Sequence, residues 1–190
     1  MDGLTGLTVG RLADELGISK SGLYAHFGSK QQLQLETITA AHEVIQREVM
    51  QPTMAAPQGL ARLEALCESY LSYVERLVFP GGCFFASLLA EMDARPGPVR
   101  DVVMELERSW IGQLTQLIQD AQRRGELSDK VDPAQLAFEI DACLELSNYH
   151  YVLFGEQAII ERGRRAIQRA LELSRPRRAP RRRQHSNTGI

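Results

Sequence analysis

Two short helical segments with clear start and stop signals lie near the beginning of this 190-residue chain, between Leu7 and Leu33. Thr8 and Ser19 can each cap a helix, because a side-chain oxygen accepts hydrogen bonds from the free backbone amides of the first turn. Gly17 follows the first segment, where a left-handed glycine ends a helix at low steric cost. Two short helices joined by such a tight turn form a helix-turn-helix, which presents its second helix to the major groove of DNA.

Apolar residues in both segments recur at helical spacing, as expected for short helices that each bury one face. They fall at Val9, Leu12, Ala13 and Leu16 in the first segment and at Leu23 and Phe27 in the second. Gly28 and Ser29 then repeat the arrangement of stop and cap in front of a third helix.

The string as a whole is more specific than two capped helices. It closely resembles the DNA-binding signature of the tetracycline-repressor (TetR) family. The residues that carry the resemblance are Thr8, Val9, Leu12, Ala13, Gly17, Ile18, Ser19, Lys20, Leu23, Tyr24, Ala25, His26, Phe27, Ser29, Lys30 and Leu33. Over about residues 7–173 the resemblance implies an all-α fold. Such a fold has an N-terminal helix-turn-helix DNA-binding head, a long connecting helix and a helical C-terminal ligand-binding and dimerisation domain.

The resemblance also implies which side chains meet DNA. Lysine offers positive charge to phosphates, and hydroxyl groups offer directed hydrogen bonds. The predicted contact residues are Thr8, Ser19, Lys20, Ser21, Gly22, Tyr24, His26 and Lys30. Gly22 and Ala25 are small where many members of the family carry a larger residue, so the operator sequence stays open.

In the family, an earlier helix covers the apolar sides of the two helices in the head. Only six residues precede Leu7, so we expect this first helix to be missing. Burial of one large apolar side chain contributes about 1.5–3 kcal/mol, and the head would lose part of that stabilisation. Two functions therefore stay open. One is a DNA-binding transcriptional regulator, a repressor released by a small-molecule ligand; the other is a DNA-incompetent dimeric helical ligand-binding module.

Helical periodicity continues along most of the remaining chain, and its breaks fall at clusters of proline and glycine. We expect helices over about residues 30–50, 58–77, 83–93, 99–124, 133–154 and 157–173. Gln51 with Pro52, and Ala56 with Pro57, should end the first of these, because proline lacks an amide hydrogen and clashes with the preceding turn. The expected domains are a DNA-binding domain at 1–36, with its helix-turn-helix at about 8–27, a regulatory and dimerisation domain at 37–173 and a tail at 174–190.

The tail is rich in arginine and carries no acidic residue, which predicts disorder. Without its six arginines the net charge of −2 becomes −8, so an acidic body carries a basic appendage. The tail is either a phosphate-binding arm or a solvated terminus without a role, and the second interpretation is favoured. Residues 1–50 contain four basic and six acidic residues, but residues 17–34 hold two lysines and no acid. The charges of the head can therefore be segregated by face.

The C-terminal domain is expected to form a homodimer and to sense an unknown small apolar effector. A twofold dimer would place two reading helices about one DNA turn apart on a palindromic double-stranded operator. The predicted dimer seam is Ala137, Ile140, Leu144, Tyr151, Ile160, Ala166, Ile167 and Leu171. The predicted pocket residues are Phe84, Phe85, Met92, Met104, Trp110, Cys143 and Tyr149.

Other classes of function find little support in the sequence. The three cysteines are scattered, which favours reduced core residues over disulfides, and no spacing typical of metal ligands occurs. We expect no catalytic residues, no metal and no cofactor, because no histidine lies near a nucleophile-like turn and no glycine-rich phosphate loop is present. No run of about 18 apolar residues occurs, so we expect no membrane span and a cytoplasmic protein.

Overall fold

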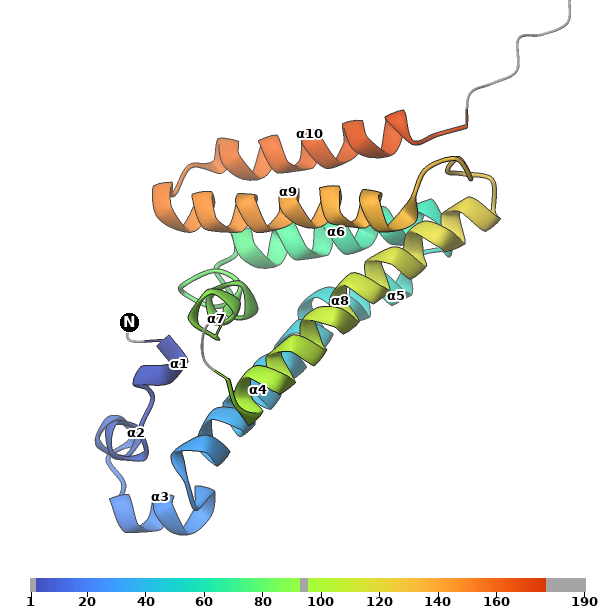
Figure 1. Ribbon diagram of the computed structural model, residues 1–190. Coiled ribbons are helices and arrows are strands. Elements are labelled where there is room, and N and C mark those ends of the chain that lie inside the picture. The colour runs from blue at the N-terminus through green and yellow to red at the C-terminus, as the bar shows by residue number, and fades with distance from the viewer. Residues whose placement is uncertain (1–2, 93–95, 177–190) are drawn as a thin grey trace, which may run out of the picture.

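The computed structural model describes residues 3–92 and 96–176, and over these residues the chain forms helices and no strand (Figure 1). The predicted all-α fold is confirmed. The helices are α1 (Gly3–Gly6), α2 (Val9–Leu16), α3 (Lys20–Phe27), α4 (Lys30–Ile45), the π-helical turn η1 (Gln46–Met50), α5 (Gln51–Ala55), α6 (Leu60–Glu75), α7 (Phe84–Met92), α8 (Pro98–Arg123), α9 (Pro133–Phe154) and α10 (Gln157–Leu173). None of the described helices is long and apolar enough to span a membrane. Most of the predicted tail lies outside the described residues.

Helices α2, α3 and α4 begin at the predicted capping residues. In each case a side-chain oxygen accepts a hydrogen bond from the backbone amide three residues later, at 3.1–3.2 Å. The pairs are Thr8 with Arg11, Ser19 with Gly22, and Ser29 with Gln32. Gly17 ends α2 with a φ of 65° and donates its amide to the Ala13 carbonyl. A residue with a side chain would be strained in this left-handed conformation.

The connecting helix passes Gln51 and Pro52, so the end expected near residue 50 was wrong, and it stops at Ala55, before the other predicted stop at Ala56 and Pro57. It widens at η1, where the Gln51 amide donates to the Gln46 carbonyl five residues back, and then continues as α5. Pro52 cannot donate to the carbonyl four residues earlier, and a wider turn before a proline relieves the clash of its ring. The buried Thr53 hydroxyl also donates a hydrogen bond to the Val49 carbonyl at 2.7 Å. This side-chain bond helps to stabilise the wide turn.

The core of the C-terminal domain lies between α6, α8, α9 and α10 (Figure 1). Each helix contributes at least one side chain with no exposed surface, namely Leu63, Leu114, Ile140 and Ile160. Burial of each such side chain contributes about 1.5–3 kcal/mol, so this cluster holds the four helices together.

Most of the predicted dimer seam lies in this core rather than on the surface. Six of its residues are less than 5% exposed, namely Ala137, Ile140, Leu144, Ile160, Ile167 and Leu171. The seam prediction was wrong for them because α9 and α10 each turn an apolar face inward: α6 and α8 cover that of α9, and α6 and α9 cover that of α10. The outer face of α9 carries Phe138, Leu146 and Leu153, which are 54–71% exposed.

Residues before α2 tie the head to the body. Leu4 in α1 is 5% exposed and packs in a small cluster with Ile38 of α4, Leu88 of α7 and Val103 of α8. Its amide donates to the Glu91 carboxylate at 2.8 Å. The single turn of α1 therefore connects α7 to the head, although it is much shorter than a helix that would cover α2 and α3.

Some apolar side chains of the head are buried, and others are exposed to solvent. Val9, Ala13, Leu23 and Leu33 form its core, with exposed fractions of 1–5%. Leu12 and Phe27 pack partly against them. Leu16 and Ile18, by contrast, are 57% and 51% exposed, so one apolar side of the α2–α3 turn faces solvent.

Candidate functional site

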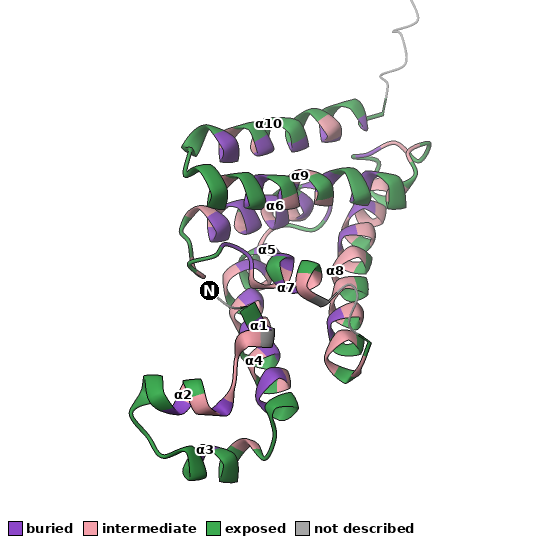
Figure 2. Cartoon of the chain, turned by 60° about the vertical axis from the view of Figure 1, so that its left-hand side comes forward, coloured by how far each residue is buried: buried purple, intermediate pink, exposed green. Residues whose placement is uncertain are grey.

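The helix α3 lies at the end of the molecule remote from α9 and α10, and most of its surface is exposed (Figure 2). Leu23 is buried and Phe27 is half-buried against α2, as their spacing predicts. Their burial turns the remaining side chains outward. The exposed residues of α3 include Lys20, Ser21, Gly22, Tyr24 and His26, which are five of the predicted DNA contacts.

The other predicted contacts surround this face. Ser19 and Thr8 use a side-chain oxygen as a cap and keep a hydroxyl proton to offer. Lys30 is exposed in the first turn of α4. All eight predicted contacts therefore belong to α3, to its cap, or to the start of a neighbouring helix of the head.

Lys20, a basic residue of this set, has an acidic partner in the structure. The Lys20 ammonium lies 3.5 Å from the Asp14 carboxylate, and both side chains are more than 60% exposed. An exposed pair of this kind contributes less than about 1 kcal/mol, so a phosphate can compete for the lysine. The charge pattern of the head is thus compatible with DNA, although residues 1–50 carry more acids than bases.

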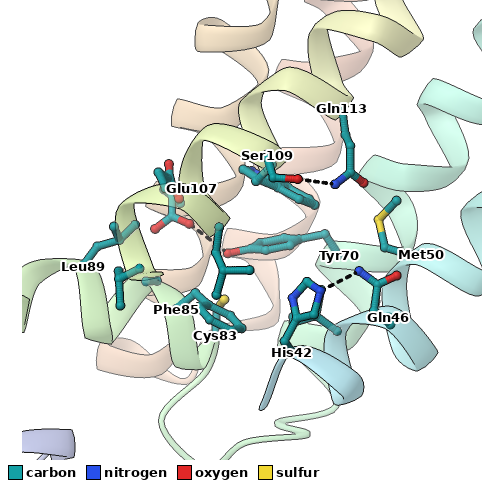
Figure 3. A pocket seen from close by; sticks show the side chains of 16 residues that line it. His42, Gln46, Met50, Tyr70, Cys83, Phe85, Leu89, Glu107, Ser109 and Gln113 are labelled. Carbon is teal, nitrogen blue, oxygen red and sulfur yellow. Dashed lines mark hydrogen bonds between the residues drawn. The ribbon is translucent and has the colours of Figure 1, made fainter. Parts of the chain in front are cut away.

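A second candidate site is a cavity of about 60 Å³ in the C-terminal domain (Figure 3). It lies where the connecting helix meets α6, α7, α8 and α9. Its lining residues are His42, Ile45, Gln46, Met50, Tyr70, Cys83, Phe85, Ala86, Leu89, Val103, Leu106, Glu107, Ser109, Trp110, Gln113 and Glu145. The volume is enough for a few water molecules, so a larger ligand needs its walls to move apart.

Two of the predicted pocket residues, Phe85 and Trp110, line this cavity. Phe84 points instead into the cluster around Leu4 and Leu88, because neighbouring residues of a helix face different directions. Met104 is half-buried outside the lining, and the side chain of Met92 lies outside the described residues.

The remaining two also lie elsewhere. Cys143 lines a shallow groove between α9 and α10, and the Tyr149 hydroxyl donates to the Ala86 carbonyl at 3.0 Å. Because all of the predicted pocket residues lie at or beyond Phe84, the sequence-based prediction missed the cavity wall formed by His42, Gln46 and Met50. Their spacing of four residues along one helix face is the signal that could have found them.

The cavity is acidic as well as aromatic. The pKa of Glu145 is raised to about 7, first by burial and then by the nearby Asp141 and Glu107, while a hydrogen bond from Tyr70 at 3.1 Å acts the other way. Burial also raises the pKa of Glu107, and then the nearby Asp141 does so. Asp141 accepts a 2.7 Å hydrogen bond from the Trp110 indole, and burial raises its pKa too.

Family models match both parts of the chain. A model for the C-terminal domain of tetracyclin-repressor-like proteins matches residues 59–167, and a model for bacterial regulatory proteins of the tetR family matches residues 2–37. The chain belongs to the TetR family. The two matched regions are separated by residues 38–58, which include most of the connecting helix.

Individual relatives agree with this assignment. The transcriptional regulator AcuR of Cereibacter sphaeroides is 29% identical over 136 residues, which are 71% of this chain and 62% of AcuR. This chain therefore spans less than two thirds of the length of the curated relative that it matches.

Solved structures of TetR proteins share the fold. A regulator from Chloroflexus aurantiacus has a TM-score of 0.78 at 24% identity, with 89% of this chain and 84% of that chain covered. AibR, solved with isovaleryl coenzyme A and operator DNA, has a TM-score of 0.69 at 20% identity, with 92% and 90% covered. At these identities the comparisons show the common architecture alone.

The TetR architecture here connects the two candidate sites through one continuous helical rod. α4 carries Lys30 at its first turn, and the same helix places His42 and Ile45 in the cavity wall. The π-helical turn adds Gln46 and Met50 to that wall. The helix that carries the head is therefore also one wall of the cavity.

The outer face of α9 and α10 is a third surface of note in this TetR chain (Figure 2). Phe138, Leu146, Tyr149 and Leu153 recur at the spacing of one helix face, and each is at least 45% exposed. Leu173 at the end of α10 is 77% exposed. Exposed apolar side chains that gather on one helix face are typical of sites of protein association.

Proposed function

We propose that this chain is a DNA-binding transcriptional regulator, a homodimeric repressor that a small-molecule ligand releases from a palindromic operator. The observation that carries the proposal is the exposed helix α3 on a rod that also forms the cavity wall. The head at 1–36 reads DNA, and the domain at 37–173 dimerises and senses the ligand. Family membership supports the proposal, as does AibR, which was solved with both an acyl coenzyme A and operator DNA.

Dimerisation is assigned to the outer face of α9 and α10, with Phe138 and Leu153 in place of the residues predicted from sequence. Twofold symmetry doubles every contact across such a surface. It also places two copies of α3 on the same side of the dimer, where they can enter successive major grooves.

Release follows from coupling between the cavity and α4. A ligand shifts the equilibrium only if it binds the non-DNA-binding arrangement more tightly than the DNA-binding one. The cavity is small in this structure, so a ligand larger than it must push α4 and η1 away from α8 in order to bind. That movement changes the spacing of the two heads.

A gel-shift titration with the DNA upstream of the gene tests the proposal. Lys30→Ala removes one predicted phosphate contact from each subunit, and we expect about tenfold weaker binding and a shallower dependence on salt. Lys130→Ala is the matched control, because this lysine is exposed in the loop before α9, far from the head, and should leave affinity unchanged. Equal binding by both variants would refute the assignment of the head.

The alternative function is a DNA-incompetent ligand-binding module. The exposed Leu16 and Ile18 favour it, because they leave the head only partly packed. Failure of the unmodified chain to shift any fragment of the upstream region, with α-helical circular dichroism intact, would establish this alternative over the first proposal.

A further inference from the structure

We propose that the effector is a compact organic cation with an apolar body, held by Glu107 and Glu145 against the rings of Tyr70 and Trp110. This inference rests on the proposed function, since it assigns a ligand class to the cavity beside the connecting helix. The cavity, its aromatic walls and the charges of its lining residues are separate observations that agree on this class.

Two carboxyl groups line the cavity, and the basic side chain among its lining residues, His42, pairs with Gln46 rather than with either of them. Glu107 and Glu145 line it, and Asp141 lies beside both of them and close to Trp110. Among the described residues that line it there is no lysine or arginine, and the ion pairs found in the described structure lie elsewhere. Removing a carboxylate from water without a counter-charge is costly, so a cation that enters this space relieves an existing penalty.

The aromatic side chains form a wall that suits the same ligand. The rings of Tyr70 and Trp110 lie 5.7 Å apart between centroids at an angle of 37°, and Phe85 stands edge-on to the His42 ring at 6.3 Å. Figure 3 shows Tyr70 reaching across the cavity between Glu107 and His42. The face of an aromatic ring attracts a cation, and the attraction grows when the site is shielded from water.

Most hydrogen-bonding groups at the cavity are acceptors or are already engaged. The Tyr70 hydroxyl donates to Glu145, and the Trp110 indole donates to Asp141. The Gln46 side chain pairs with His42 at 3.2 Å, along its own helix. A carboxylate or phosphate ligand would therefore meet like charge and few free donors, whereas an ammonium group would meet two carboxyl groups.

The same contacts explain how the cavity can enlarge. Gln46 and His42 bond to each other rather than across the cavity, so the α4 wall is held to α8 mainly by apolar contacts. A ligand that separates these walls does not have to break a hydrogen bond between them. Its charge then fixes it to α8 and α9, while its apolar body displaces α4.

The single tryptophan of the chain makes the test direct, because Trp110 lines the cavity and reports on its occupancy. We would titrate the full chain at pH 8 with benzylammonium and trimethylphenylammonium as cations, benzyl alcohol as the neutral probe and benzoate as the anion. We expect the cations to change Trp110 emission with at least about tenfold higher affinity than the other two probes. Equal or tighter binding of benzyl alcohol or benzoate would overturn the proposal.

Variants then test whether Glu107 and Glu145 supply the charge that binds the cation. Glu107→Gln and Glu145→Gln keep the side-chain size, and each should reduce cation affinity about tenfold while leaving benzyl alcohol binding nearly unchanged. Glu139→Gln on the exposed side of α9 is the control and should bind the cations as the unmodified chain does. Cation binding that is insensitive to Glu107→Gln and Glu145→Gln would refute the assignment of these two residues.

The experiment separates this proposal from the proposed function. No Trp110 response to either cation, together with a normal gel shift, would overturn the ligand class and leave DNA binding in place. A selective response to cations without any DNA binding would support the ligand class and refute the regulator. Release of bound DNA by the cations, at the concentrations that change Trp110 emission, would support both.

Discussion

Replacement of Glu145 by glutamine is expected to stabilise the protein above pH 7 and to have little effect near pH 4.5. Burial raises the pKa of this carboxyl group from 4.5 to about 7 in the folded chain. Between these values the folded state binds more protons than the unfolded state, so the stability of the unmodified protein falls as pH rises. The contribution of the protonated group is fully present below pH 4.5 and is lost above about pH 7.

The size of the effect follows from the two pKa values. A difference of about 2.5 units corresponds to about 3.4 kcal/mol, at about 1.4 kcal/mol per unit. Solvent reaches part of the side chain and the shift is shared with Asp141 and Glu107, so we expect about 2 kcal/mol. Glutamine keeps an oxygen that accepts from the Tyr70 hydroxyl, so the hydrogen bond is retained.

Thermal unfolding of both proteins at equal concentration from pH 4.5 to pH 8.5 measures this difference. About 2 kcal/mol raises the melting temperature of a chain of this size by roughly 4–8 °C, and this gain should shrink steadily toward pH 4.5. The exposed Glu139→Gln variant controls for the loss of one carboxyl group from α9 and should show no such trend. A Glu145→Gln protein that is no more stable than the unmodified chain at pH 8 would refute the assignment of a buried, uncompensated charge.

Three further predictions concern packing and assembly. Leu153→Glu places a charge on the apolar outer face of α9, where Leu153 is 71% exposed, and should convert dimers to monomers in sedimentation experiments without loss of helix content. Gly163→Leu should destabilise the fold by about 1–3 kcal/mol in denaturant titrations, because an added Cβ would overlap the Ser147 side chain where α10 crosses α9; unchanged stability would show that the two helices can separate freely. Asn148→Ala removes the acceptor of a buried 2.7 Å hydrogen bond from the Cys83 amide and should cost about 1–3 kcal/mol, whereas a neutral result would mean that water replaces it.

The sequence alone determined most helix limits and the identity of the reading head. Caps at Thr8, Ser19 and Ser29 and the stop at Gly17 depend on hydrogen bonds and backbone angles within a few residues, so they can be read locally. The inward positions of Leu23 and Phe27 can also be predicted locally, because their spacing of four residues places both on one helix face. The chain passes Pro52 because the turn before it widens, and periodicity does not report such an adjustment.

The tertiary structure decided which apolar face meets which neighbour. α9 carries apolar residues on two faces, so only its packing on α6 and α8 shows that Ile140 is core and Leu153 is surface. Phe84 and Phe85 are adjacent and chemically identical, yet only Phe85 lines the cavity. The acidic character of the cavity has the same origin, since Glu107 and Glu145 are far apart in the sequence and meet only because α8 packs on α9. Local chemistry fixes where helices begin and end, whereas the orientation of each helix about its axis depends on contacts between distant residues.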